Sequence, residues 1–289
     1  PRFRYARFKD VALPVPPASK QRAIADYLDE KTAAIDALIE KKERLIALLA
    51  EKRAALIHQA VTKGLDPTVP MKPSGIPWIG DIPAHWDVRR LKHCVSHVVD
   101  CHHSTPTYDV DGEYPALRTA DVRLGYLGVD GARRVRRDEF IHRISRLRPK
   151  PGDIIYSREG ERWGLAALVP DGATVCLAQR VMLFRARNDA SGAYLMWALN
   201  SSGIYNQLAV HVVGATSPHV NISDIREVFV ALPSYAEQKH IAEQLDVLVG
   251  GANDLSAKLA VSVERLSEYR QALITAAVTG QLNIPGVAA

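Results

Sequence analysis

The sequence predicts an α+β fold, in which one mostly β domain lies between two long helices that pair as an antiparallel coiled coil. A stretch of about 50 residues returns 217 positions later without a gap, which points to an internal repeat. Both copies are rich in Ala, Leu, Glu, Lys and Arg, contain no internal proline, and carry apolar residues with a period close to 3.5. The segment between them carries short runs rich in Val, Ile and Tyr, separated by Asp-Gly and Pro-Gly turns, as in short strands.

The repeat defines the two helices. Pro16 to Asp29 is echoed by Pro233 to Asp246, and the match continues to residues 60–62 and 277–279, near the glycines at 64 and 280. We expect helices over about 19–63 and 236–280, since each copy begins just after a proline and ends near a glycine. Two amphipathic helices on a globular core remain an alternative, but the matched length and register favour pairing. The predicted interface consists of Leu28, Ile35, Leu38, Leu45, Leu49, Leu56, Leu245, Leu248, Leu255, Leu259, Leu266 and Leu273.

The remaining chain divides around these helices. Residues 1–16 align, at the same offset, with residues 218–233, so we expect the chain to open with the end of a second domain of the same kind. The connection after the first helix contains four prolines and is expected to be extended. One clear helix is expected inside the β domain, near 193–208. The predicted divisions are a truncated domain tail (1–17), the first helix (18–65), a Pro-rich linker (66–77), the β domain (78–233), the second helix (234–281) and a C-terminal tail (282–289).

Composition and missing motifs argue against several functions. The net charge of +5 permits a polyanionic partner without requiring one. No apolar run is long enough for a membrane span, and three cysteines are too few for a disulfide framework, so we expect a cytoplasmic protein. The sequence contains no phosphate-binding loop, no dinucleotide fingerprint and no nucleophile elbow. We therefore expect a chain without catalytic residues.

Several segments of the β domain have the chemistry of a DNA contact. An arginine-rich run extends from 133 to 150, and guanidinium groups suit phosphates and guanine edges. Loops at 157–164 and 213–219 combine glycine with polar or charged residues, and a third candidate at 118–121 follows a short apolar run; solvated faces and ordinary turns are the alternatives. The predicted DNA-binding residues are Arg118, Thr119, Arg133, Arg134, Arg136, Arg137, Arg143, Arg146, Arg158, Glu159, Arg162, Thr216 and His219.

A metal site is an alternative use of the cluster Cys94, His97, Cys101, His102 and His103. These are zinc ligand types, but the spacing is neither a Cys-x-x-Cys nor a His-x-x-x-His pair. A nuclease would need clustered carboxylates beside a lysine, and Pro170-Asp171 is not followed by Glu-x-Lys. We therefore expect no metal in this chain.

Four stretches together resemble the specificity (S) subunit of type I restriction–modification systems. They are the paired helix openings at Pro16 to Asp29 and Pro233 to Asp246, the segment Ser74 to Trp86, the segment Gly152 to Gly160, and Asn221 to Ile225 leading to Pro233. The resemblance covers essentially the whole chain. It departs from the family's usual plan, because only one recognition domain is complete.

The resemblance implies a sequence-specific, non-catalytic DNA-recognition subunit of an enzyme complex, whose β domain is a target-recognition domain. The implied partners are double-stranded DNA, a methyltransferase (modification) subunit and a restriction subunit, and the single recognition domain leaves a homodimer open. No cofactor is expected in this chain, while S-adenosylmethionine and ATP are expected on the partner subunits. The alternative is a coiled-coil scaffold that binds proteins and does not read DNA; a steep dependence of DNA binding on salt would separate the two.

Overall fold

A computed structural model describes residues 15–214 and 218–284. They fall into two compact units: a helix unit, within residues 1–51 and 251–289, and a domain unit, residues 52–250. Two long helices run through both, α2 (Ala18–Lys63) and α8 (Tyr235–Val278). The expected first and last tails lie mostly outside the described residues.

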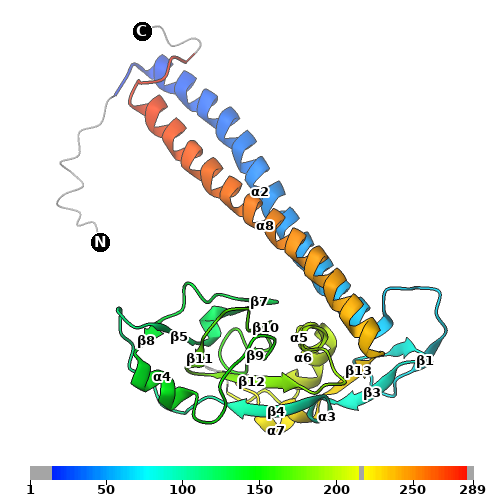
Figure 1. Cartoon of the computed structure of the whole chain (residues 1–289). Coiled ribbons are helices and arrows are strands. Elements are labelled where there is room, and N and C mark those ends of the chain that lie inside the picture. The colour runs from blue at the N-terminus through cyan, green and yellow to red at the C-terminus, as the bar shows by residue number, and fades with distance from the viewer. Residues whose placement is uncertain (1–14, 215–217, 285–289) are drawn as a thin grey trace. The chain divides into compact units, whose positions relative to one another are not determined.

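In the helix unit the two helices run antiparallel. Figure 1 shows the beginning of α2 beside the end of α8. Arg270 of α8 pairs with Asp36 of α2, with its Nε 2.7 Å and its Nη2 3.1 Å from the two carboxylate oxygens. The least exposed side chains of each helix recur at alternating steps of three and four residues, as expected of two helices packed along one seam. In this unit they are Leu28, Thr32, Ile35, Ile39, Lys42, Ile46 and Leu49 in α2, and Ala252, Ser256, Leu259, Val263, Leu266, Arg270, Leu273 and Ala277 in α8.

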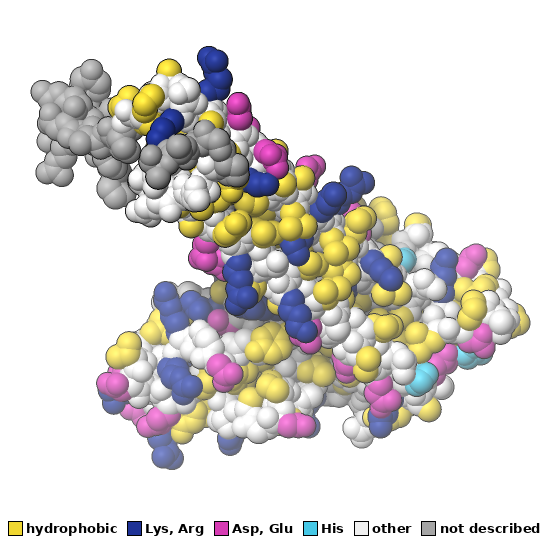
Figure 2. Space-filling model, turned by 90° about the horizontal axis from the view of Figure 1, so that it is seen from above, with side chains coloured by type: hydrophobic (Ala, Val, Ile, Leu, Met, Phe, Trp, Pro, Cys, Tyr) yellow, Lys and Arg dark blue, Asp and Glu magenta, His cyan; other side chains and the backbone are white. Residues whose placement is uncertain are grey.

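The predicted seam needs correction at four positions. Leu38 and Leu45 are each 43% exposed, while Ile39 and Ile46 occupy the seam. In α8 the side chains of Leu248 and Leu255 are likewise exposed. In α2, Leu38 stands next to Ile39 and Leu45 stands next to Ile46, so the sequence offers two apolar stripes along the helix. Only the stripe that contains the two isoleucines is covered. Figure 2 shows hydrophobic side chains on the outside of the helices.

The domain unit contains the β structure, built mainly around an antiparallel sheet of order β10-β9-β12-β4. A second sheet has the order β11-β5-β8, and three two-stranded ribbons pair β1 with β2, β3 with β13, and β6 with β7. The strands are β1 (Met71–Pro73), β2 (Asp81–Pro83), β3 (Asp87–Arg90), β4 (Val95–Asp100), β5 (Tyr114–Leu117), β6 (Val122–Arg123), β7 (Tyr126–Leu127), β8 (Arg134–Val135), β9 (Ile154–Ser157), β10 (Ala166–Leu168), β11 (Cys176–Leu177), β12 (Val181–Ala186) and β13 (Phe229–Leu232). The short helices are α3 (Leu91–Cys94), the 3-10 turn η1 (Thr119–Asp121), α4 (Arg137–Arg143), α5 (Gly192–Leu199), α6 (Ser202–Ala209) and α7 (Ile222–Glu227).

Both faces of the central sheet are buried. Met182 and Phe184 of β12 belong to one hydrophobic cluster, while Val181 and Leu183 belong to another. Because successive side chains of a strand point to opposite faces, the apolar run of β12 covers both sides. The expected strands at 153–156 and 181–184 therefore read as continuous apolar runs and not as alternating ones.

The helix expected near 193–208 is two helices, α5 and α6, with Asn200 and Ser201 between them. The Ser201 hydroxyl accepts from the Ile204 amide at 3.4 Å, so it caps the second helix. The Asn200 side chain turns back to the sheet, since its Oδ1 accepts from the Ala166 amide and its Nδ2 donates to the Ala166 carbonyl. The polar pair interrupts a helix that composition alone would continue.

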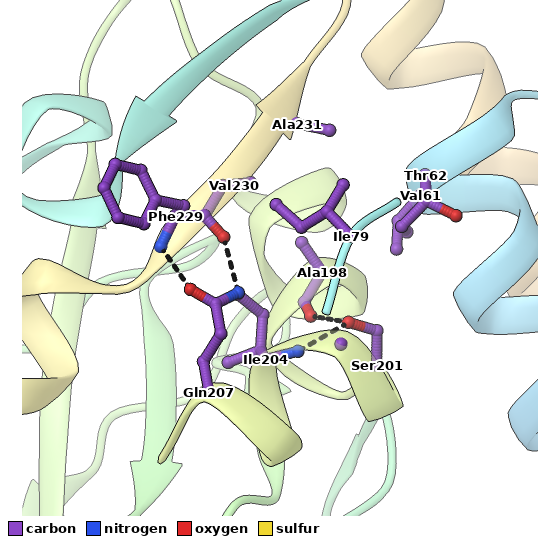
Figure 3. A pocket seen from close by; sticks show the side chains of 11 residues that line it. Val61, Thr62, Ile79, Ala198, Ser201, Ile204, Gln207, Phe229, Val230 and Ala231 are labelled. Atoms are coloured by element: carbon purple, nitrogen blue, oxygen red, sulfur yellow. Dashed lines mark hydrogen bonds between the residues drawn. The ribbon is translucent and has the colours of Figure 1, made fainter. Parts of the chain in front are cut away.

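The inner ends of both long helices contribute to the core of the domain unit. Ile57, Ala60 and Val61 of α2 share the largest hydrophobic cluster with Ile241 and Leu245 of α8. A small cavity lies beside the last turn of α2 (Figure 3). Its lining is mostly apolar, and its polar side chains Thr62, Ser201 and Gln207 all have protein partners; Gln207, for example, bonds both the amide and the carbonyl of Phe229. The cavity is therefore a packing gap without an unpartnered polar side chain to hold a ligand.

Candidate nucleic-acid interface

Two of the loops expected to contact DNA lie side by side. The Gly160 amide donates to the Pro218 carbonyl at 2.8 Å, and the Val220 amide donates to the Arg158 carbonyl at 3.1 Å. Glu159 and His219 form an isolated antiparallel bridge between the same segments. Residues 157–160 and 218–220 are thus joined by main-chain hydrogen bonds, although they are far apart in sequence. Thr216 lies outside the described residues.

The loop at 118–121 touches this pair through an arginine. Arg162, which is exposed, donates from Nη1 to the Ala120 carbonyl at 3.1 Å. Within that loop, the Asp121 carboxylate accepts from the Arg118 amide at 2.8 Å and from its Nε at 3.2 Å, so the Arg118 side chain is held locally. Thr119 lies between them, partly exposed, in the turn η1. The structure therefore brings all three predicted loops into one cluster.

Arg158 does not face solvent, contrary to its predicted place among exposed DNA-contacting residues. Its side chain is 9% exposed, and its guanidinium lies 3.2 Å and 3.4 Å from the two oxygens of Asp100 and 2.7 Å from Glu159. A buried guanidinium requires such partners, because an unpaired charge in the interior is costly. Arg158 therefore anchors the loop through its nearly buried ion pair with Asp100, while Glu159 stays partly exposed.

The arginine-rich run is not one solvated face. Arg143 is buried in α4, where it bonds Glu139 at 2.6 Å and the Ser104 carbonyl at 2.9 Å. Arg146 donates to the carbonyls of Asp100 and Cys101. Arg146 and the remaining predicted members are exposed. Arg136 pairs with Asp109, Arg134 donates to the Glu113 carbonyl, Arg133 lies over the ring of Tyr108, and Arg137 begins α4.

Arginines of the run therefore hold the segment 100–113 in place, and several of their guanidinium groups remain exposed to solvent. The same segment supplies Asp100, which binds Arg158 of the loop cluster. On the face seen in Figure 2, Lys and Arg are interspersed with Asp and Glu and do not form one uniform block. Arginine density alone was thus a poor guide to which guanidinium groups are free for a ligand.

Sequence reasoning missed Arg180. It follows β11 and directly precedes β12, has a φ of 61°, and presents a side chain that is 55% exposed. Its carbonyl accepts from the Arg158 amide at 3.2 Å, which fixes it to the loop cluster. No glycine or turn motif marks residues 179–180, and only the left-handed backbone conformation distinguishes the position.

An aromatic stack lies at the other end of the same loop. The rings of Trp163 and Tyr205 lie 4.4 Å apart between centroids and 18° from parallel, and Tyr205 is exposed. Gly164 has a φ of 90°, and a Cβ there would lie 3.3 Å from the Tyr205 ring. The loop thus needs glycine at this point both for its conformation and for the close approach of the ring.

The cysteine–histidine cluster does not converge on a common point. In the described ranges, 15–214 and 218–284, no three His, Cys, Asp or Glu side chains are placed to hold a metal ion. The three cysteines are free and buried. Burial raises the pKa of the Cys94 thiol to about 11 and that of Cys176 to about 12, so neither forms a thiolate readily.

Among the described residues, no helix combines the length and the apolar character needed to cross a bilayer. The domain unit is a mostly β domain whose polar loops gather at one place and whose core includes the inner ends of two long helices. That is the class of protein defined by the architecture.

The family follows from sequence comparison. Residues 85–265 match the model of the type I restriction modification DNA specificity domain, which is more than half of the chain, and the chain belongs to this family. It is 25% identical over 287 residues to the EcoKI specificity subunit of Escherichia coli K12, covering 96% of this chain and 59% of the relative. It is 22% identical over 282 residues to the MjaVIII specificity subunit of Methanocaldococcus jannaschii, covering 96% and 63%.

The fold resembles that of a solved structure. A chain from a solved structure, described as the structural basis of complex assembly and conformational transition of the type I R-M system, superposes with a TM-score of 0.54 at 19% identity, over 93% of this chain and 62% of that one. The predicted α+β class is confirmed. The chain spans about three fifths of the length of the curated relatives it matches.

Proposed function

We propose that the chain is a sequence-specific DNA-recognition subunit of a type I restriction–modification complex and that it performs no chemistry itself. The observation that carries this is the family match over residues 85–265, which includes the whole loop cluster and much of α8. The proposal assigns the reading of double-stranded DNA to the domain unit, and the binding of partner subunits to the long helices.

The chemistry of the loop cluster supports the first assignment. Glu159 lies beside Arg180 and is bridged to His219, while Arg162 of the same loop contacts Ala120, so the cluster includes both hydrogen-bond donors and acceptors. Base edges in the major groove present both kinds of group, so a reader needs both. The exposed arginines at 133, 134, 136 and 137 are suited to phosphate contacts, which add affinity without sequence preference.

The long helices support the second assignment. Leu38, Leu45, Leu48 and Leu255 remain exposed on the helix unit, and apolar patches of this kind mark protein–protein contacts. The proposed occupants are the methyltransferase (modification) and restriction subunits, which would carry S-adenosylmethionine and ATP. A cytoplasmic location belongs to the same proposal, as does a homodimer that would supply a second reading domain by two-fold symmetry.

The proposal is tested by co-expressing the chain with a type I modification subunit from the same source, in a host without other methylation, and mapping methylated bases genome-wide. We expect methylation at one recurring sequence, only when both chains are present. A control lacking residues 78–233 but keeping both helices should bind the partner in a pull-down and methylate no recurring sequence. Co-purification without any recurring methylated sequence would instead support a protein-binding scaffold.

The DNA contact is tested separately with the complete chain and a random-sequence duplex library. Binding should weaken steeply between about 50 and 200 mM salt, because each phosphate contact releases counterions. Binding that does not change with salt would contradict the proposed phosphate contacts of the arginine-rich run.

A further inference from the structure

Arg180 occupies an unusual backbone position. Its φ of 61° places it in the left-handed region, which residues other than Gly, Asn, Asp and His rarely adopt. Among the described residues it is the only non-glycine residue with a positive φ. Its carbonyl is held by the Arg158 amide, and the next residue, Val181, accepts from the Cys101 amide at 3.3 Å. The surrounding structure therefore imposes this conformation, a pattern associated with functional sites.

The left-handed turn directs the side chain toward the neighbouring loop. Arg180 Nε lies 3.7 Å from Glu159 Oε2, and a Cβ on Gly160 would lie 3.9 Å from Arg180 Nη1. The guanidinium thus lies beside the loop, yet more than half of the side chain stays accessible to solvent. An arginine at an exposed site does not need a left-handed backbone for its own stability, so the placement calls for another reason.

Glu159 is itself held in place by the nearly buried Arg158. Its Oε1 lies 2.7 Å from Arg158 Nη2, while Arg158 is anchored on Asp100. Charges therefore alternate from the interior to the surface through Asp100, Arg158, Glu159 and Arg180. Asp100 and Arg158 are nearly buried, Glu159 is 22% exposed and Arg180 is 55% exposed, so a nearly buried ion pair supports one carboxylate and one guanidinium side by side.

We propose that Arg180 and Glu159 together read one G·C base pair, with Arg180 donating to guanine O6 and N7 and Glu159 accepting from the cytosine amino group. This rests on the proposed function of the chain. The guanidinium fork matches the two acceptors of guanine, and a carboxylate matches the cytosine N4 donor. A phosphate contact is disfavoured, because the Glu159 carboxylate beside Arg180 would repel a phosphate. The pair is therefore suited to a base edge.

The test is a selection from a random-sequence duplex library by the complete chain, followed by sequencing of the bound DNA. Arg180→Ala should enrich the same motif as the unaltered chain, except that one G·C pair loses its preference by roughly 5- to 150-fold. Glu159→Gln should weaken the preference at that same pair. Arg180→Gly, which suits the left-handed backbone, should lose the preference while melting no lower than the unaltered chain.

Arg187→Ala is the matched control. Arg187 is 57% exposed and its Nε lies 3.7 Å from Asp189, so it resembles Arg180 in exposure and pairing but lies outside the loop cluster. It should leave the motif unchanged. The inference is overturned if the Arg180 variants enrich the original motif in full, or if they lose binding equally at every position. If the unaltered chain enriches no motif at all, the proposed function fails and this inference with it.

Discussion

The two copies of the repeat have nearly the same sequence signature but different surroundings. At the start of α8, Ile241, Ala242 and Leu245 are buried in the core of the domain unit. At the start of α2, the equivalent Ile24 and Leu28 are only partly buried and Ala25 is exposed. The repeated pattern therefore encodes a surface able to pack against a domain, and only one copy uses it within the described residues.

The glutamine that opens each copy shows the same difference. Gln21 donates to the Pro16 carbonyl at 2.7 Å, and Gln238 donates to the Pro233 carbonyl at 2.9 Å, an identical local contact. Gln238 is buried, and its Oε1 also accepts from the Ser191 amide at the start of α5. The local contact comes from the repeat itself, whereas the long-range one depends on Ser191 of the domain unit.

The largest expected difference between the copies concerns the repeated isoleucine. Ile241→Ala should lower the free energy of unfolding by about 2–5 kcal/mol, because it leaves a cavity in the core. Ile24→Ala should cost less than about 1 kcal/mol, as expected away from a core. Urea unfolding followed by circular dichroism measures both. Equal costs would mean that the first copy is packed as tightly as the second.

The glutamines should differ by a smaller amount. Gln238→Ala leaves the Ser191 amide without its partner in a buried place, which should cost about 1–3 kcal/mol. Gln21→Ala removes an exposed hydrogen bond and should change stability by no more than about 0.5 kcal/mol. Thermal melting of the two variants is compared directly. A similar loss of melting temperature in both variants would show that the shared hydrogen bond to the proline carbonyl, and not the bond to Ser191, provides most of the stabilisation.

The exposed contact of the helix unit should matter less still. Arg270→Ala removes the pair with Asp36 and should cost about 0–1 kcal/mol, because both side chains are accessible to water. The cost should shrink as salt is raised from about 0.05 to 1 M, since ions screen exposed charges. Asp36→Ala should behave alike, and the double variant should lose no more than either single one. A larger, salt-independent cost would show that this pair is a main support of the seam.

The smallest effect is expected at the repeated aspartate. Burial raises the pKa of Asp246 above its ordinary value, although the Trp197 indole donates to its carboxylate at 2.8 Å. The folded state then holds the proton more tightly than the unfolded state. This tighter proton binding contributes fully to the free energy of unfolding below the ordinary pKa of an aspartate. The contribution is lost as the pH rises through the raised pKa of Asp246.

Asp246→Asn lacks this titration, so its melting temperature relative to the unaltered chain should rise by a small amount as the pH goes from about 3 to 6. Asp29→Asn, at the equivalent exposed position of α2, is the matched control. A relative melting temperature of Asp246→Asn that falls over this range would show that the indole hydrogen bond outweighs burial.

Much of the fold was accessible from sequence because its signals are local or periodic. The helix expected over 19–63 is α2 (Ala18–Lys63), and the one expected over 236–280 is α8 (Tyr235–Val278). The choice between two apolar stripes in α2 was not accessible, because Leu38 and Ile39 are equally hydrophobic and only the partner helix decides between them. The break before Ser201 depends on contacts of Asn200 with Ala166, which lies in a distant strand.

The candidate site was predictable only at the level of loops. Charged and polar residues marked 157–164 and 118–121 as candidate contact loops, but that the two are neighbours was not predicted and follows from the contact of Arg162 with Ala120. The burial of Arg158 depends on Asp100, which is 58 positions earlier, and no local pattern announces that partner. Arg180 lies between two short strands, where its sequence context resembles any exposed arginine. Which charged groups face outward is decided by packing between distant segments.

The ribbon of β3 with β13 has a consequence for how such chains diversify. Asp87 pairs with Leu232 and Arg90 with Phe229, so the two ends of the intervening segment are hydrogen-bonded neighbours. Everything between them forms a closed insert, joined to the inner ends of the helices through a short ribbon. Genetic exchange of that insert for another closed by a similar ribbon would leave both junctions where they are. An exchanged insert would also have to keep the contacts with the helices, such as those of Tyr194 with Val61 and of Trp197 with Asp246.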